Sequence, residues 1–159
     1  MLVLGVGNLL LMDEGVGVRV VQELSGRFIF PDDVDIIDGG TLGLDLLPYL
    51  EDRECAIIID AAKMGKPAGS VGRIAEESMP WMINKKLSSH QVGIAELITI
   101  ANITGKLPKK LILIGIEPKC IQVGLEISKE VSDRIDEVIS LVIQELTSLG
   151  LDIKEKELM

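Results

Sequence analysis

Four acidic residues and one histidine are the side chains best placed to do chemistry in this sequence. Asp13 and Glu14 are adjacent and follow the first apolar segment, while Asp38 and Asp60 each follow a later one. His90 is the single histidine of the chain. Carboxylates and an imidazole with open coordination positions suit a divalent metal that keeps water, such as nickel, zinc or manganese. Crowded carboxylates also repel one another, so they require protons, hydrogen bonds or a cation.

Each of these residues also has a purely structural interpretation. Asp13 and Glu14 can offset the positive end of a helix that follows them. Asp38 precedes two glycines and can be a turn former. A lone histidine such as His90 is often structural or simply exposed. Asp60 directly follows a buried apolar run and is the hardest of the five to explain in this way. Their shared location, rather than any one residue, favours a functional site.

Short apolar segments predict the strands that position these residues. The expected strands are 1–6, 34–37, 55–59, a short edge strand at 71–75, and 111–116. The segment 55–59 is a continuous apolar run, which is typical of a strand covered on both faces. Two of the five strands therefore arrive directly at an aspartate, Asp38 or Asp60.

Apolar residues at steps of three and four predict the helices between these strands. The first helix is expected from Gly15 to Leu24. A second follows Thr41 as its cap and is stopped or kinked by Pro48. A third begins at Ser88 with the spacing of a capping box, which places His90 in its first turn. The last helix follows Ser128 as far as residue 149, where Gly150 closes it.

This alternation of strands and helices predicts an α/β fold. We expect one three-layer domain over residues 1–150, with a twisted, mostly parallel sheet of about five strands and helices on both faces, followed by a loosely held charged tail over residues 151–159. The carboxyl ends of parallel strands share one edge, where ligands bind. Glu14, Asp38 and Asp60 should therefore gather at this edge, with His90 close by.

The composition of the chain argues against several classes of function. The chain has 159 residues, of which 47% are apolar, and its net charge is −9. Such an acidic chain is a poor partner for nucleic acid or an anionic membrane. Cys55 and Cys120 lie far apart, so we expect free thiols in the core or a loop. The first apolar run is too short and too uncharged at its start for a signal peptide, and we expect a cytoplasmic protein.

Other motifs in the sequence are weak evidence for a function. Gly5 and Gly7 begin a dinucleotide-binding pattern, but its third glycine position holds Leu10. Met79 and Trp81 stand in an expected loop, which is either part of a partner surface or a lid packed on its own core.

Five short motifs in this order resemble those of the hydrogenase maturation proteases, and the resemblance extends from Leu2 to about Leu149. The motifs are Gly5-x-Gly7-Asn8, Asp13-Glu14-Gly15-x-Gly17, Asp38-Gly39-Gly40-Thr41, Asp60-Ala61 and Ser88-x-His90-Gln91. The resemblance implies an endopeptidase that removes a short C-terminal extension from the large-subunit precursor of a nickel-iron hydrogenase, after nickel has been inserted. The expected partner is the nickel-loaded precursor.

The resemblance also implies roles for individual residues. Glu14, Asp60 and His90 match the positions that bind nickel, for which cadmium or zinc can stand in, and the nickel would arrive with the precursor. Asp38 matches a segment that helps to recognise the substrate. Some relatives carry Asp where this chain has Glu14, which leaves the metal bond length open.

Two mechanisms and two other functions remain open at this point. Nickel could polarise the scissile carbonyl or a bound water, with Asp38 orienting that water or the substrate backbone. Alternatively, the carboxylates could act as an acid-base pair, as in an aspartyl protease, with nickel only as a recognition element. Outside proteolysis, the chain could be a nickel-sensing assembly factor that does not cut its partner, or a nucleotide-binding module that uses Gly5 and Gly7.

Overall fold

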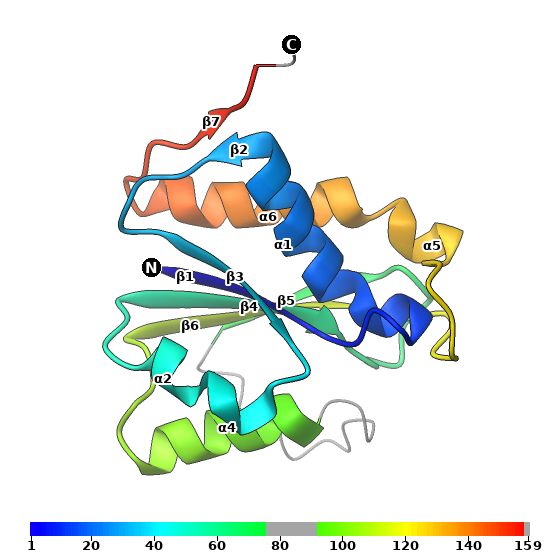
Figure 1. Cartoon of the computed structure of the whole chain (residues 1–159), viewed down its shortest axis with the longest axis horizontal. Coiled ribbons are helices and arrows are strands. Elements are labelled where there is room, and N and C mark those ends of the chain that lie inside the picture. The colour runs from blue at the N-terminus through cyan, green and yellow to red at the C-terminus, as the bar shows by residue number, and fades with distance from the viewer. Residues whose placement is uncertain (76–91, 158–159) are drawn as a thin grey trace.

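The computed structural model describes residues 1–75 and 92–157, which form a five-stranded sheet between two layers of helices (Figure 1). The strand order is β3-β1-β4-β6-β5. The strands are β1 (Leu2–Val6), β3 (Asp35–Gly40), β4 (Cys55–Ala61), β5 (Val71–Ala75) and β6 (Lys110–Ile116). Only β5, at one edge, runs antiparallel to its neighbour. The predicted α/β class, the mostly parallel sheet and the short edge strand are confirmed.

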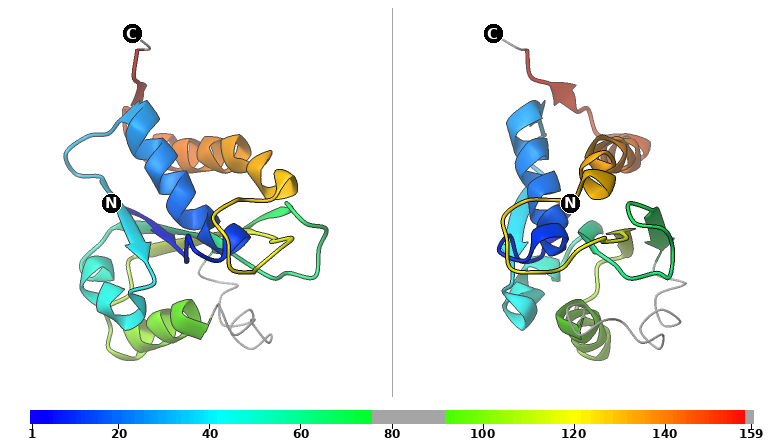
Figure 2. Two further views of the ribbon diagram at one scale, coloured as in Figure 1. Left: turned by 45° about the vertical axis from the view of Figure 1, so that its right-hand side comes forward. Right: turned by 90° about the vertical axis from the view of Figure 1, so that its right-hand side faces the viewer.

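Helices cover both faces of the sheet (Figures 1 and 2). One layer contains α1 (Val16–Arg27), α5 (Lys129–Ser132) and α6 (Ile135–Ser148). The other layer contains the 3₁₀-helix η2 (Gly43–Leu46), α2 (Leu47–Leu50) and α4 (Val92–Ile103). A further 3₁₀ turn, η1 (Met12–Gly15), leads into α1. In the described part of the chain, no helix has the length and apolar character needed to cross a membrane.

The central strand β4 separates two hydrophobic cores and sets the direction of Asp60. Ile57 and Ile59 pack into the core under α1 and α6, whereas Ala56 and Ile58 pack into the core that faces α4. Successive side chains of a strand point to opposite faces. Asp60 therefore belongs to the face that α2 and α4 cover.

Glycines allow α1 to lie directly against the sheet. A Cβ atom on Gly17 would lie 2.1 Å from the carbonyl oxygen of Ile59, and one on Gly5 would lie 2.2 Å from that of Gly17. Gly7 has a φ of +135°, which side chains rarely adopt, and a Cβ there would lie 1.9 Å from the carbonyl oxygen of Glu14. Gly5 and Gly7 thus have a packing role, which accounts for them without a bound nucleotide.

Two details of the segment after β3 differ from the sequence prediction. Thr41 does not cap a helix, because η2 begins only at Gly43, after Leu42, and has no side-chain cap. Pro48 lies in the first turn of α2 and does not stop it. A proline is tolerated there because the first helical N–H groups have no partner within the helix.

The C-terminal part of the chain also differs from the sequence prediction. A helix follows Ser128 as predicted, and Ser128 caps it by accepting a hydrogen bond from the N–H of Val131. That helix, α5, ends after one turn, and α6 begins separately at Ile135. The prediction of a loosely held tail is wrong for residues 151–155, because β7 (Lys154–Glu155) pairs with β2 (Phe28–Ile29) and the side chains just before it pack on the core.

Several predictions lie outside the described residues. These are the capping box at Ser88 and Gln91, the position of His90 in a first turn, and the loop with Met79 and Trp81.

Candidate active site

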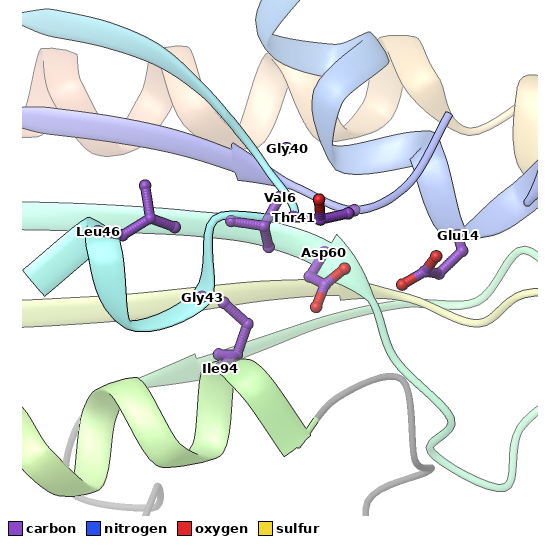
Figure 3. A pocket seen from close by; sticks show the side chains of 9 residues that line it. Val6, Glu14, Gly40, Thr41, Gly43, Leu46, Asp60 and Ile94 are labelled. Atoms are coloured by element: carbon purple, nitrogen blue, oxygen red, sulfur yellow. The ribbon is translucent and has the colours of Figure 1, made fainter. Parts of the chain in front are cut away.

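A small pocket lies at the carboxyl edge of the sheet, where the sequence predicts the site (Figure 3). Its cavity measures about 130 Å³. The lining comes from five separate parts of the chain and consists of Val6, Gly7, Glu14, Gly40, Thr41, Gly43, Leu46, Asp60 and Ile94. Glu14 and Asp60 are its acidic groups, and Figure 3 shows their carboxylates lying near one another, with the start of α4 below.

Asp60 is an unusual residue for a central strand. Its exposed fraction is 6%, at a position flanked by Ile59 and Ala61. Burial raises the pKa of its carboxyl well above the ordinary value, and the negative charge of Glu14 raises it further, while a hydrogen bond from the Ala61 N–H opposes both effects. An ionised Asp60 is therefore costly in the isolated protein and would be stabilised by a cation.

Glu14 reaches the pocket from η1, at the point where the chain turns from β1 into α1. Its exposed fraction is 9%. Met12, two residues before Glu14, has a φ of +54°, which is uncommon for a residue with a side chain. Two backbone hydrogen bonds hold this turn in place. The Met12 N–H donates to the carbonyl of Gly124, and the Glu14 N–H donates to the carbonyl of Leu11.

Asp13 has a role that the sequence does not reveal. Its carboxylate is fully buried and accepts hydrogen bonds from the N–H of Lys119 (2.9 Å), the N–H of Cys120 (3.0 Å), and both the N–H and the hydroxyl of Ser128 (2.7 and 2.8 Å). Burial alone would raise the pKa of Asp13, but these four hydrogen bonds outweigh it and lower the pKa. Asp13 thus holds the loop after β6 against the segment that carries Glu14.

Glu117 is a further buried carboxylate, and the sequence pattern does not single it out. It directly follows β6 and has an exposed fraction of 8%. Its side chain accepts a hydrogen bond from the N–H of Met64, and its backbone exchanges hydrogen bonds with Gly69 and Ser70. It therefore fixes the loop between β4 and β5. The only sequence signal for this role is an acidic residue at the end of a buried strand.

Asp38 lies beside the pocket and does not line it. Its side chain is exposed, and its Oδ1 accepts a hydrogen bond from the Gly40 N–H at 3.0 Å. This is the turn-forming arrangement that the sequence leaves open for Asp38. The next residues of the same motif, Gly40 and Thr41, do line the pocket.

Of Glu14, Asp38, Asp60 and His90, the residues predicted to form the site, the structure brings Glu14 and Asp60 together in the pocket. His90 lies outside the described residues. Within residues 1–75 and 92–157, no group of three or more His, Cys, Asp or Glu side chains is arranged to hold a metal ion. Two neighbouring carboxyl groups, one with a raised pKa, form an arrangement that can exchange a proton or supply oxygen ligands to a metal.

Comparison with known proteins identifies the family. The model of the family HycI, hydrogenase maturation protease, matches residues 18–145. The chain is 38% identical over 157 residues to the hydrogenase 2 maturation protease of Escherichia coli, covering 98% of this chain and 96% of that one. It is 40% identical to a hydrogenase expression/formation protein, HupD, of Bradyrhizobium diazoefficiens, covering 98% of this chain and 82% of the relative.

Comparison with solved structures points to the same family. The hydrogenase maturating endopeptidase HybD from E. coli superposes with a TM-score of 0.90 at 37% identity, covering 98% of this chain and 96% of that one. A hydrogenase 2 maturation peptidase from the Thaumarchaeota archaeon SCGC_AB-539-E09 gives 0.69 at 35% identity, covering 95% and 98%. The family match, the relatives and the fold lead to one conclusion: the chain belongs to the hydrogenase maturation proteases and is an endopeptidase.

Proposed function

We propose that this endopeptidase removes the C-terminal extension of a nickel-iron hydrogenase large-subunit precursor after nickel insertion, and that it recognises the nickel through Glu14, Asp60 and His90. The observation that carries the proposal is the pair of buried carboxyl groups, Glu14 and Asp60, in one pocket at the carboxyl edge of the sheet. The substrate follows from family membership and from the relatives named after hydrogenase maturation.

The donor chemistry fits a cation that arrives with the substrate. Two carboxylates supply oxygen ligands, and an imidazole suits nickel. Burial and the charge of Glu14 make ionised Asp60 unfavourable in the isolated protein. A divalent cation between the two groups would remove that repulsion and hold both in the ionised form. The free enzyme therefore holds a proton on Asp60 more tightly than an exposed carboxyl group does, and the nickel of the precursor would displace that proton.

His90 is included because of the element that follows it. The helix α4 begins at Val92, two residues after His90, and Ile94 of its first turn lines the pocket. The start of α4 therefore lies at the pocket that Glu14 and Asp60 line, and His90 precedes it by two residues in the sequence. An imidazole from this segment would complete a set of three ligands.

The chain's own groups then have distinct tasks in the reaction. Glu14, Asp60 and His90 fix the precursor so that its scissile bond lies against the edge of the sheet. Nickel, as part of the substrate, supplies polarisation of a carbonyl group or a water molecule. Asp38, next to the pocket, orients that water or the substrate backbone. If undiminished cleavage is measured with Asp38→Asn, Asp38 has no part in the chemistry.

The experiment that tests the proposal follows the mass of the precursor. Purified enzyme is incubated with the large-subunit precursor, with and without inserted nickel, and intact masses are measured for wild type and His90→Ala. We expect a C-terminal peptide to be lost only when nickel and His90 are both present. Binding with no change in mass would instead identify a non-proteolytic assembly factor, and cleavage without nickel would remove the metal role of these residues.

A second measurement separates the two mechanisms. The precursor is loaded with a cation of similar geometry but different acidity. A cleavage rate that follows the acidity of the cation supports polarisation by the metal. A rate that does not change supports an acid-base role for Glu14 and Asp60, with nickel as a recognition element only.

A further inference from the structure

We infer that the C-terminal extension of the precursor binds as an added strand along the outer edge of β3, antiparallel to it, so that the enzyme holds the extension through its main chain. The inference rests on the proposed function and adds how the enzyme grips the part that it removes.

β3 is the last strand at one edge of the sheet, and its outer side has no partner strand among the described residues. Figure 1 shows it in front of the other strands. The Asp35 N–H donates to the carbonyl of Met1, and the pairing with β1 then continues residue by residue to Asp38. Hydrogen bonds to a neighbouring strand come from alternate residues. Ile37 therefore also faces β1, and the backbone N–H and C=O groups of Ile36 and Asp38 face outward.

The pocket leads from Asp60 to this edge. Its lining includes Asp60 on β4, Val6 and Gly7 at the end of β1, and Gly40 and Thr41 at the end of β3. β4, β1 and β3 are adjacent in the sheet, in that order. A peptide that crosses the pocket from Asp60 over the end of β1 thus arrives at the outer edge of β3.

The extension is the part of the precursor best suited to this edge. The enzyme removes it, so it does not belong to the core of the mature large subunit and can adopt an extended form. An edge strand presents a row of unpaired N–H and C=O groups, and an extended peptide binds such a row by adding a strand. The affinity of this mode comes from main-chain hydrogen bonds, which any residue except proline can donate.

Strand geometry gives the direction and register of the pairing. Neighbouring strands lie about 4.8 Å apart, so a strand added beside β3 would lie about 14 Å from β4. An extended chain covers about 3.4 Å per residue, so about four residues separate the scissile bond from the first pair. From there the extension would run from the end of β3 toward its start. In an antiparallel pair, Asp38 and then Ile36 would each exchange hydrogen bonds with one residue of the extension, and these two residues are two positions apart.

The first test compares Ile36→Pro with its matched control Ile36→Ala. Both variants lose the same apolar side chain, but only proline also removes the outward N–H, and an edge strand tolerates proline where the N–H faces away from its neighbour. Affinity for the nickel-loaded precursor is measured by interferometry, and KM and kcat are measured from intact-mass time courses. Thermal unfolding shows whether both variants are folded.

We expect Ile36→Pro to raise Kd and KM about fivefold relative to Ile36→Ala, with little change in kcat, because the net contribution of one hydrogen bond corresponds to roughly this factor. Equal Kd and KM for the two folded variants would overturn the inference. If Ile36→Pro does not fold, the second test decides.

The second test keeps the enzyme unchanged and varies the precursor. The residues of the extension are replaced one at a time, first by proline and then by alanine, and KM and Kd are measured with wild-type enzyme. We expect proline to raise both about fivefold at alternate positions, from about the fourth residue after the scissile bond onward, and alanine to have little effect there. A proline effect without this alternation, or one that alanine equals, would overturn the inference. If wild type binds the precursor without cutting it, the proposed function fails, while the alternating pattern in Kd still supports pairing along β3.

Discussion

At the scale of single residues, this protein contains two buried aspartates whose pKa values move in opposite directions. Asp13 accepts four hydrogen bonds, which outweigh its burial and lower its pKa. Asp60 has one opposing hydrogen bond, so burial and the charge of Glu14 dominate and its pKa is raised. The difference assigns Asp13 to stability and leaves Asp60 for function, because functional carboxyl groups are commonly held at a cost to the fold.

The raised pKa of Asp60 makes a specific stability prediction. The folded state binds the proton more tightly than the unfolded state, so the contribution of Asp60 is most favourable below its ordinary pKa of 3.8 and is lost as the pH rises through the folded pKa. Asp60→Asn removes this loss of stability at high pH, because the amide side chain does not ionise. We expect it to raise the free energy of unfolding at pH 8 by about 1 kcal/mol, a usual gain for such replacements, and the gain to shrink as the pH falls toward 4.

Urea denaturation of wild type and Asp60→Asn across this pH range measures the effect. A variant that is less stable than wild type at pH 8, or a gain that does not depend on pH, would contradict the assignment of Asp60 as a strained functional carboxyl.

Asp13 is predicted to behave in the opposite way. Asp13→Asn replaces a carboxylate that only accepts hydrogen bonds with an amide whose donors face the donors of Lys119, Cys120 and Ser128. We expect a loss of about 3 kcal/mol in the free energy of unfolding, since a hydrogen bond to a charged group contributes about 1.5–3 kcal/mol. The matched control Asp133→Asn changes a carboxylate that is 60% exposed and should cost less than about 0.5 kcal/mol.

The pH dependence of the stability difference between wild type and Asp13→Asn gives a further check on the role of Asp13. Because the folded pKa of Asp13 is lowered, its stabilisation is present above pH 3.8 and is lost as the pH falls through the folded value. The difference between wild type and Asp13→Asn should therefore narrow in acid. Equal stability of the two proteins at pH 7 would show that the four hydrogen bonds do not stabilise the fold.

At the scale of elements, α1 is the helix whose placement defines the pocket. It packs so closely on β1 and β4 that Gly17 touches the carbonyl of Ile59, and this contact sets how near Glu14 comes to Asp60. The sequence shows the helix through its apolar spacing, but not the closeness of this contact, because spacing reveals which face is buried and not the distance to the partner.

Two glycines in this helix offer a matched comparison. Gly17→Ala places a methyl group 2.1 Å from a backbone oxygen, and we expect it to cost about 3 kcal/mol because neither backbone can move freely. A Cβ added to Gly26 of the same helix would meet no other part of the protein within 4 Å, so Gly26→Ala should stabilise the protein by about 0.5–1 kcal/mol through helix propensity. Thermal unfolding of both variants measures this, and a neutral Gly17→Ala would contradict the close packing.

Two elements near the C-terminus differ from the sequence prediction. The apolar spacing continues from Val131 to Leu149, which predicts one helix, yet the chain breaks between α5 and α6. Ser128 contacts Asp13 as well as capping α5, and a contact 115 residues away leaves no local pattern. Tertiary contacts of this kind also hold the chain after Gly150, whose short strand β7 pairs with β2.

At the scale of the whole molecule, the topology of the sheet assembles the site. β1 and β4 are neighbours in the sheet although their paired residues are 54 positions apart in the chain: Leu2 pairs with Ala56, and Gly5 pairs with Ile59. Parallel pairing places the turn after β1 beside the end of β4, and so brings Glu14 to Asp60. This much follows from the sequence through the rule that parallel strands end at one edge. The turn-forming hydrogen bond of Asp38, by contrast, depends on the local backbone and required the structure.

The measurement that tests the central claim most directly is the cleavage of nickel-loaded precursor by Asp60→Asn, followed by intact-mass spectrometry beside wild type and Asp133→Asn. Because Asp60→Asn is expected to be at least as stable as wild type, a loss of activity cannot be ascribed to unfolding. We predict that wild type and Asp133→Asn release the C-terminal peptide and that Asp60→Asn releases none. Release by Asp60→Asn at the wild-type rate would contradict the claim that the pocket of Glu14 and Asp60 is the active site.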